Sequence, residues 1–426
     1  MATNQSSPQK MDKAFLYAAI VIAVGVLATT LAQVQVLGLI PLRNLLKNEL
    51  HADRATTAGF FFWALMAWYF KPLCGVFTDA FPMFGSRRRS YLLIFTSLGV
   101  LAWFGLSVTP HTYGKLLTVV ILINVFQVVV STVVGAYMVE VAQAISGSGR
   151  LSAIRNFIQQ VSYIASGSIA GLLASIPFAW TGIACGSIMF LLIPATLFFL
   201  MEQKKHTDST VLLANARKQL VVIANARTMW AAAGLMALFY LAPGLQTATF
   251  YKQQNDLHMS TEMQGFLQTL AGIGGVSAAS FYIFVCRFWN LKKLLILCLG
   301  SATVTALGFL FYTSVLNVEI VETVYNFGFV LGELALMDLA VRATPAGSEG
   351  LGFSLMMSVR NLALFGTDWF GSKLLDTFHW SFNGLVVANA ATTLIAVPLT
   401  LLLPIYLVSR KDNEAAAVPK LKTATD

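Results

Sequence analysis

The stretch LLTVVILINVFQVVVSTVVGAYMVEVAQA, residues 116–144, is apolar almost throughout and holds one charged residue, Glu140. A bilayer core about 30 Å thick is crossed by roughly 20 apolar residues in a helix, because backbone groups left unpaired in hydrocarbon are costly. The stretch therefore predicts a transmembrane helix. Composition extends this interpretation to the whole chain, since 57% of residues are hydrophobic and only 11% are charged. Soluble domains carry about 25% charged residues.

Further apolar stretches predict an all-α membrane protein of about twelve spans. Besides 116–144 they are residues 14–40, 58–80, 91–108, 151–173, 178–201, 229–251, 263–288, 291–312, 318–343, 351–375 and 382–408. A polar stretch separates the sixth span from the seventh. We therefore predict a cytoplasmic tail (1–13), a six-helix bundle (14–201), a cytoplasmic linker (202–228), a second six-helix bundle (229–408) and a disordered cytoplasmic tail (409–426).

The loop charges predict the orientation. Lys and Arg favour cytoplasmic loops, and most of them fall on one side if both termini are cytoplasmic. The other side then holds only Arg43, Lys47, Arg54, Lys115 and Lys252. The net charge of +9 is thus a topology signal, and no nucleic-acid partner is expected.

A sequence repeat indicates that the two bundles are related. Arg155-Asn156 near the start of the fifth span and Arg360-Asn361 near the start of the eleventh are 205 residues apart. The basic residues Arg88 and Lys293, which follow the second and eighth spans, are separated by the same offset. Repeats of this kind are typical of membrane transporters.

Motifs for enzymatic chemistry are missing from the sequence. It has no Gly-rich phosphate loop, no HExxH and no nucleophile elbow, and its four cysteines lie in apolar runs without CxxC spacing. We expect no enzymatic activity, no metal site and no cofactor. ATP hydrolysis is not expected as the energy source, which leaves a secondary transporter or facilitator.

Ionisable residues inside predicted spans are the candidate site residues, because a charge in hydrocarbon is costly unless it is paired or faces water. They are Lys71, Glu333, Asp338, Arg360 and Asp368. Glu333 and Arg360 lie at similar depth on consecutive spans. They either serve a substrate site or form an ion pair that only holds two helices together.

Polar side chains in other spans allow two interpretations. Arg155 and Gln159 share one face of the fifth span, and Gln33 lies in the first. They line a polar cavity, or they act as interhelical contacts, with Arg155 reaching the membrane surface. Pro243-Gly244 weakens the seventh span, either as a gating point or as a static kink.

The segment KPLCGVFTDAFPMFGSRRRSYL, residues 71–92, resembles the signature of the folate-biopterin transporter family within the major facilitator superfamily. The superfamily element in this loop needs the acid, the glycine and the basic cluster, here Asp79, Gly85, Arg87, Arg88 and Arg89. The resemblance implies a gating role for them. Asp79 at a helix end can pair with arginines or a helix N-terminus and latch one conformation.

A second segment, residues 345–361, is similar to the family's Pro-x-Gly-x-Glu loop and the helix start that follows it. Glu349 is the acidic residue of this loop and joins the gating candidates. Asn361 matches the family pattern, whereas Arg360 departs from it, because a small or apolar residue is expected there.

The resemblance implies a major facilitator fold of two pseudo-symmetric six-helix bundles that transports by alternating access. The implied substrate is folate or a pterin. Lys71 or Arg360 would meet carboxylates, Glu333 or Asp368 would bind the pterin's N–H groups, and Tyr325 would stack on the ring. Gln33, Arg155, Gln159 and Asn361 complete the predicted substrate site, and Glu333, Asp368 and Asp338 are the candidates for proton coupling.

Two alternatives stay open. One is a major facilitator carrier of another solute, such as a drug, an amino acid or a metal complex, and the other is a receptor or channel that does not cycle. In each case the partners expected are the lipid bilayer and a small solute, with a coupling proton for a symporter. We expect a monomer in the cell membrane, and the short N-terminal stretch before the first span favours a bacterial inner membrane.

Overall fold

The computed structural model describes residues 8–144, 148–202, 209–286, 288–345, 349–409 and 411. Most of the predicted C-terminal tail and the start of the predicted linker therefore lie outside the described residues. The described chain is helical and has no strand, apart from a single bridge between Met83 and Ser86.

Helices fill all twelve predicted ranges, either singly or as short series. The first ten are α1 (Pro8–Thr30), α2 (Leu39–Asn48), α3 (Arg54–Ala64), α4 (Met66–Tyr69), α5 (Lys71–Ala80), α6 (Arg89–Val108), α7 (Tyr113–Ala144), α8 (Ser148–Ala174), α9 (Ala179–Phe190) and α10 (Leu192–Phe199). The others are α11 (Ser209–Asn225), α12 (Arg227–Tyr240), α13 (Gln246–Asn255), α14 (Thr261–Val285), α15 (Leu291–Ala306), η1 (Leu307–Phe311), α16 (Val315–Ala343), α17 (Glu349–Asp376), α18 (Phe382–Leu399), η2 (Thr400–Leu402) and α19 (Ile405–Val408).

Seven helical stretches of the described chain are long and apolar enough to cross a membrane. They are Arg89–Val108, Tyr113–Met138, Ala179–Phe199, Thr261–Val285, Leu291–Phe311, Val315–Ala343 and Phe382–Leu402. Among the other predicted spans, residues 14–40, 58–80 and 229–251 are each divided among shorter helices. Part of α11 and α12 pass the test together, but the chain bends by 75° between them.

The prediction of one continuous helix over residues 14–40 is wrong. Helix α1 ends at Thr30, and the chain turns before α2 begins at Leu39. Polar side chains stabilise this break: Gln33 Nε2 donates to the Thr29 carbonyl at 2.5 Å, and Gln127 of α7 donates to the Ala32 carbonyl. Carbonyls freed by a helix break inside a membrane need such donors.

Two more predicted spans are also interrupted. Residues 58–80 are divided among α3, α4 and α5, and Pro72 lies in the first turn of α5, where its missing N–H leaves no hydrogen bond unmade. Residues 229–251 break between α12 and α13, at the predicted weak point Pro243-Gly244. Asn389 donates to the Pro243 carbonyl at 2.8 Å, and the Gly244 N–H donates to the Thr367 carbonyl at 2.9 Å.

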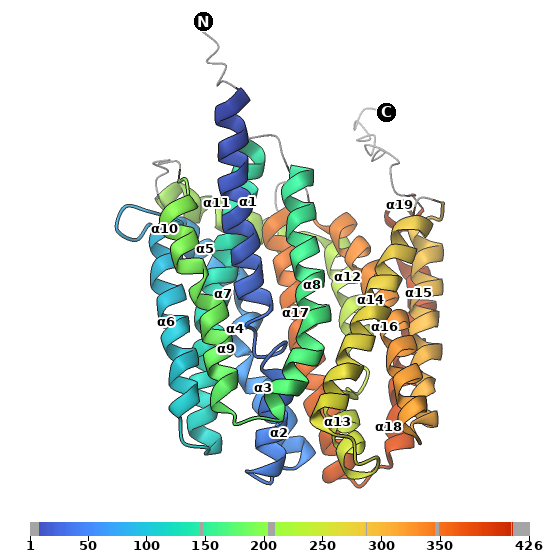
Figure 1. Ribbon diagram of the computed structural model, residues 1–426. Coiled ribbons are helices and arrows are strands. Elements are labelled where there is room, and N and C mark those ends of the chain that lie inside the picture. Colours follow the sequence, from blue (N-terminus) through green and yellow to red (C-terminus); the bar gives the residue numbers. More distant parts are fainter. Residues whose placement is uncertain are drawn as a thin grey trace, which may run out of the picture.

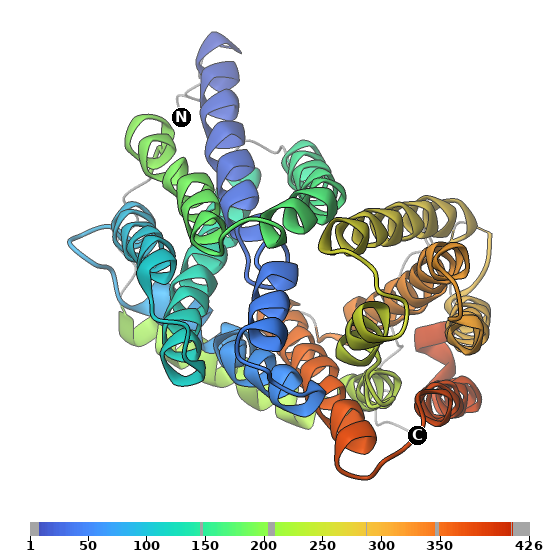
Figure 2. The same ribbon diagram turned by 60° about the horizontal axis from the view of Figure 1, so that its bottom comes forward.

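Buried apolar side chains form separate cores in the two parts of the chain. One cluster is made of residues between Ala18 and Leu200, and two others are made of residues between Ile223 and Val408. Figures 1 and 2 show the corresponding two groups of helices, with α8 beside α14 and α17 beside α3 where the groups meet. We call them the N-half, α1 to α10, and the C-half, α12 to α19.

The helix order repeats with an offset that is two to four residues shorter than the predicted 205. Adding 205 to the first residues of α6, α7, α8 and α9 gives positions 294, 318, 353 and 384. Helices α15, α16, α17 and α18 begin at residues 291, 315, 349 and 382. The start of α1 and helix α19 lie at one end of the molecule, whereas α2 and α13 lie at the opposite end, which we call the α2–α13 end (Figure 1).

Glycines allow the two halves to touch backbone to backbone. A Cβ atom on Gly167 of α8 would lie 2.5 Å from the backbone N of Thr269, and one on Gly265 of α14 would lie 2.5 Å from the Gly167 carbonyl oxygen. Ser168 and Thr269 hydroxyls meet at 3.0 Å across the same contact. Small residues permit this close approach of membrane helices.

Candidate functional site

A cavity of about 330 Å³ lies in the C-half and is closed on one side by α2 of the N-half. Helix α2 contributes Leu39, Ile40 and Arg43, and the rest of the lining comes from segments between Phe239 and Thr393. Its volume lies at the lower end of the range for sites that bind drug-sized molecules. Its polar lining includes Arg43, Gln253, Gln264, Glu322, Asn326 and Asp368.

Asp368 is one of two predicted site residues that line this cavity. Its carboxylate accepts the Thr247 backbone N–H at 3.0 Å and the Thr247 hydroxyl at 2.6 Å, in the first turn of α13. The helix break at Gly244 makes this possible, because a Cβ there would lie 2.4 Å from the Asp368 Cα. Asp368 thus satisfies the buried Thr247 N–H at the start of α13, where a negative charge is favoured.

Arg43 lies in the wall of the cavity. The sequence predicts a loop at this position, but Arg43 belongs to helix α2, only 8% of it is exposed and it lines the cavity. Its guanidinium carbon lies 5.6 Å from the Phe61 ring centroid and 5.7 Å from that of Phe250. Its Nη2 is 3.5 Å from the Thr247 hydroxyl that donates to Asp368. Arg43 therefore brings a cation from the N-half to the carboxylate of the C-half.

Glu322 is a cavity carboxylate that the sequence analysis missed, because it lies near the start of α16 rather than at mid-span. Its Oε1 accepts the Tyr312 hydroxyl at 2.8 Å and the Gln253 amide at 3.3 Å. Tyr325, the second predicted residue in the cavity, stands one helical turn further along α16. Its ring lies 4.7 Å from Phe309 and 5.8 Å from Phe329, so it belongs to an aromatic wall.

The structure forms an ion pair between Arg360 and Glu333. Arg360 Nε also donates to the Tyr240 hydroxyl at 3.1 Å, and its Nη1 donates to Asn361 Oδ1 at 3.0 Å. Arg360, Glu333 and Asn361 do not line the cavity, whereas Tyr240 does. The ion pair therefore lies directly behind the cavity wall.

Five other predicted site residues lie away from the cavity. Lys71 donates to the Ser131 hydroxyl at 3.0 Å and lies over the Trp68 ring. Gln33 holds the α1 break, Gln159 reaches Tyr163 at 3.4 Å, and Arg155 is exposed. Asp338 is paired with Arg342 on the same helix at 2.8 Å. Of Lys71, Glu333, Arg360 and Asp368, the cavity beside α2 is lined by Asp368 alone.

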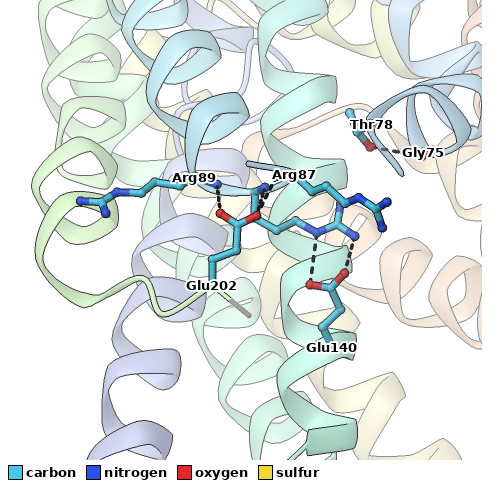
Figure 3. A network of polar contacts seen from close by, with 7 residues as sticks. Gly75, Thr78, Arg87, Arg89, Glu140 and Glu202 are labelled. Carbon is cyan, nitrogen blue, oxygen red and sulfur yellow. Dashed lines mark hydrogen bonds and ion pairs between the residues drawn. The ribbon is translucent and has the colours of Figure 1, made fainter. Parts of the chain in front are cut away.

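The basic loop before α6 is organised by two acids that the sequence analysis did not single out. Glu202 accepts the Arg87 backbone N–H at 2.6 Å and the Ser86 hydroxyl at 2.5 Å. Arg88 Nη2 pairs with Glu140, at the end of α7, at 2.6 Å (Figure 3). Gly85 has φ +74°, a conformation that glycine adopts without strain. The side chains of Asp79 and Glu349 lie outside the described part of the chain.

The electrostatics of Glu202 follow from this geometry. Partial burial acts to raise its pKa, but the Ser86 hydroxyl and the backbone N–H groups of Arg87, Arg88 and Arg89 outweigh it, so that the pKa lies below its usual value. Glu202 therefore caps the N-terminus of α6 as a carboxylate.

The sequence profile of the BT1 family matches residues 34–421. The chain belongs to the BT1 family. This member is 27% identical over 389 residues to the "Folate-biopterin transporter" of Synechocystis, covering 84% of this chain and 76% of that protein. It is 22% identical over 401 residues to "Folate transporter 1" of Plasmodium falciparum, covering 90% and 77%. It is 25% identical over 389 residues to "Probable folate-biopterin transporter 2" of Arabidopsis thaliana, covering 83% and 75%.

Solved structures confirm the predicted fold of this BT1 family member. A D-xylose-proton symporter superimposes with a TM-score of 0.70 at 13% identity, covering 93% of this chain and 98% of that one. The inward-open xylose transporter of E. coli gives 0.65 at 14% identity, covering 92% and 96%. An auto-inhibited POT family peptide transporter gives 0.68 at 13% identity, covering 94% and 99%. The BT1 family protein is therefore a multi-pass membrane transporter of major facilitator fold for a small solute, and not an enzyme.

Proposed function

We propose that this BT1 family transporter carries folate or a pterin by alternating access, with the cavity beside α2 as its substrate site. The observation that carries the proposal is the chemistry of that cavity. Carboxylates at Glu322 and Asp368 can accept the N–H groups of a pterin, and the amides of Gln253, Gln264 and Asn326 can both donate and accept.

The aromatic wall and Arg43 fit the rest of such a molecule. Tyr325, Phe309 and Phe329 offer ring faces or edges to a planar heterocycle. Arg43 is the cationic residue of the described cavity lining and suits a carboxylate such as the one at the folate tail. The names of the relatives in Synechocystis, Plasmodium and Arabidopsis support the same substrate class.

The residues outside the cavity keep proposed roles in the transport cycle. Lys71, Arg155, Gln159 and Gln33 belong to the N-half, which would complete the site when the halves rock. The Arg360–Glu333 pair, with Asn361, would support the wall at Tyr240. Asp79, Gly85, Arg87, Arg88, Arg89 and Glu349 are proposed as gating residues.

Cycling, energy coupling and location complete the proposal. Uptake would be driven by a proton, for which Glu333, Asp368 and Asp338 are the candidates from the sequence. Both termini and residues 202–228 would face the cytoplasm, the bundles would comprise residues 14–201 and 229–408, and the monomer would reside in a bacterial inner membrane.

Binding measurements on the purified protein test the substrate. Folate, dihydrofolate and biopterin are titrated against unrelated anions, drugs and amino acids by calorimetry. We expect binding by the pterin compounds, and Tyr325→Ala to weaken it roughly fivefold, since an aromatic contact contributes about 1 kcal/mol. Tyr406→Ala, an exposed tyrosine of α19 outside the cavity, is the control.

Two outcomes decide against this function. Saturable binding of a drug or an amino acid in place of the pterins would favour a carrier of another solute. Equal effects of Tyr325→Ala and Tyr406→Ala would place the site elsewhere. Counterflow in proteoliposomes distinguishes a carrier, of pterins or of another solute, from a receptor or channel, because a receptor or channel would show no counterflow.

A further inference from the structure

A line of side-chain hydrogen bonds joins the N-half to the cavity. Lys47 Nζ of α2 donates to Gln254 Oε1 at 2.7 Å, and Gln254 Nε2 donates to Gln264 Oε1 at 3.1 Å. Gln264 Nε2 donates to Gln253 Oε1 at 3.1 Å, and Gln253 Nε2 donates to Glu322 Oε1 at 3.3 Å. We call this line the amide relay.

The amide relay has a direction. Each of its glutamines accepts through its oxygen on the Lys47 side and donates through its nitrogen on the Glu322 side. The relay thus begins at a cation and ends at an anion, and hydrogen bonds aligned in this way polarise and strengthen one another. An ionised carboxylate only accepts, so Glu322 suits the end of the relay when it carries a charge.

The relay reaches a contact between the halves. Gln254, which accepts from Lys47, also donates to Asn44 Oδ1 at 3.4 Å, and Lys47 Nζ lies 5.3 Å from the Tyr251 ring centroid. Close by, Thr57 and Tyr251 hydroxyls meet at 2.7 Å and Arg54 pairs with Asp376 at 3.3 Å. All of these contacts join the two halves at the α2–α13 end.

Glu322 differs from the carboxylates that the sequence analysis proposed for coupling. Glu333 is paired with Arg360 and Asp338 with Arg342. Asp368 accepts two hydrogen bonds at the start of α13. Glu322 lines the cavity and, among the described residues, forms no ion pair within 4 Å. Taking up a proton therefore breaks no ion pair of Glu322.

The groups packed around Glu322 determine which side chains interact with its charge. The titratable or charged groups near it are Tyr312 after η1, Tyr325 on its own helix, Arg43 of α2 and Asp368 of α17. Helices α13 and α14 present neutral amides, and α15 presents Ala302 to the cavity. Arg43 interacts electrostatically with both Asp368 and Glu322, and the hydrogen bonds to Glu322 come from the neutral donors Tyr312 and Gln253.

We propose that Glu322 takes up the coupling proton and that the amide relay transmits its protonation state to the contact of the halves at Lys47. This proposal rests on the proposed transport cycle. With Glu322 ionised, the relay is complete and holds α2 against α13. Protonation turns one carboxylate oxygen into a donor and weakens acceptance from Tyr312 and Gln253. The relay loosens, and the α2–α13 end opens. By linkage, opening this end must in turn change the proton affinity of Glu322.

The residue assignment is tested by transport. Glu322→Gln is compared with Glu319→Gln, a half-buried glutamate one turn earlier on α16 that does not line the cavity. Folate or biopterin uptake is measured in proteoliposomes with and without a pH gradient, and counterflow at equal pH. We expect the ratio of the uptake rates with and without the gradient to fall to about one in Glu322→Gln, whatever its counterflow rate, and Glu319→Gln to behave as wild type. Gradient-driven uptake by Glu322→Gln at the wild-type rate would overturn the assignment.

The relay is tested without any substrate. Spin labels at Asn48 and Asn255, exposed positions of α2 and α13, report the distance between the halves in protein whose native cysteines are replaced by serine. We expect the distance to lengthen as the pH is lowered, to stay long at every pH in Glu322→Gln, and to lose its pH response in Gln264→Leu. An unchanged response in Gln264→Leu would refute the relay.

The two experiments fail for different reasons. If no pterin is transported but the distance responds to pH through Glu322 and Gln264, the substrate is wrong and the relay stands. If wild-type uptake is driven by the gradient and neither variant alters the distance response, the transport function stands and the relay is wrong. Should Glu322→Gln fail to fold, Gln264→Leu still decides the relay and Tyr312→Phe, which removes a donor to Glu322, is expected to reduce the pH response.

Discussion

The N-half and the C-half repeat each other's helices but differ in their charges. Arg155 of the N-half corresponds to Arg360 of the C-half at the offset of 205, yet the position of Glu333 is taken by Val128. Leu117 stands at the position of Glu322, and Tyr163 at that of Asp368. The acidic residues of the cavity therefore belong to the C-half, whereas the N-half contributes a cation, Arg43, at the edge of the cavity.

This difference in charge shows how two repeated helical bundles can serve different roles in one transporter. Both halves keep the helix positions that pack the fold, but the costly carboxylates of the cavity, Glu322 and Asp368, belong to the C-half. The partners of the C-half carboxylates come from the same half at Arg360 and from the opposite half at Arg43. Contacts of the second kind change when the halves move, and they are suited to coupling.

The largest expected effect comes from the Arg360–Glu333 pair. The side chains of Arg360 and Glu333 are only 20% and 15% exposed. Removal of one partner from a largely buried pair leaves an uncompensated charge and costs about 3–5 kcal/mol, so Arg360→Gln should destabilise the protein strongly. Arg155→Gln, at the equivalent exposed position of the N-half, should change stability by less than about 0.5 kcal/mol. Denaturation in detergent measures both. Equal losses of stability would mean that the pairing of Arg360 with Glu333 adds nothing to stability beyond the contribution of the exposed Arg155.

The glycine contact between α8 and α14 should give an intermediate effect. In Gly265→Ala the new Cβ would lie 2.5 Å from the Gly167 carbonyl oxygen, and relieving such a clash costs about 1–3 kcal/mol. Gly135→Ala on α7 has open space around it and should stabilise its helix by up to about 1 kcal/mol. Thermal unfolding of the two variants is the measurement, and a stable Gly265→Ala would show that the halves separate here at little cost.

The smallest effect concerns pH at Glu202 of the N-half. Because its pKa is lowered in the folded protein, its stabilisation is complete above the usual pKa of a glutamate and is lost as the pH falls through the lowered value. Glu202 is partly exposed, so the loss should stay below about 1 kcal/mol. Ser86→Ala removes one hydrogen-bond donor to Glu202, so the pKa of Glu202 should be lowered less. The loss of stability should then occur at higher pH in melting curves. A melting profile that Glu202→Gln leaves unchanged at neutral and acid pH would contradict this role.

Much of the frame was predictable because it depends on local properties of the chain. Apolar length located the spans, and the pair Arg155-Asn156 and Arg360-Asn361 revealed the duplication that the helix order shows. The motif in residues 71–92 pointed to the family that the comparisons establish. Membrane ionisable groups at mid-span were found in the same way, and Asp368 of this set lines the cavity.

The site itself was only partly predictable. Arg43 looked like a loop cation because the break after Thr30 was not recognised, and that break depends on Gln127 of a distant helix. Glu322 was missed because its importance comes from Tyr312 and Gln253, which lie elsewhere in the sequence. No pattern in residues 315–325 alone indicates those partners.

By itself the sequence determined that the chain lies in a membrane, that its helices form a duplicated frame and which family it belongs to. Each of these follows from hydrophobicity or from short local motifs. The tertiary structure alone decided which charges meet: Arg360 with Glu333, Arg43 beside Asp368, and Lys47 at the far end of a line of amides from Glu322. The physical reason is that a buried charge is stabilised by whatever donor or counter-ion packs next to it. Those neighbours are set by how helices far apart in the chain come together.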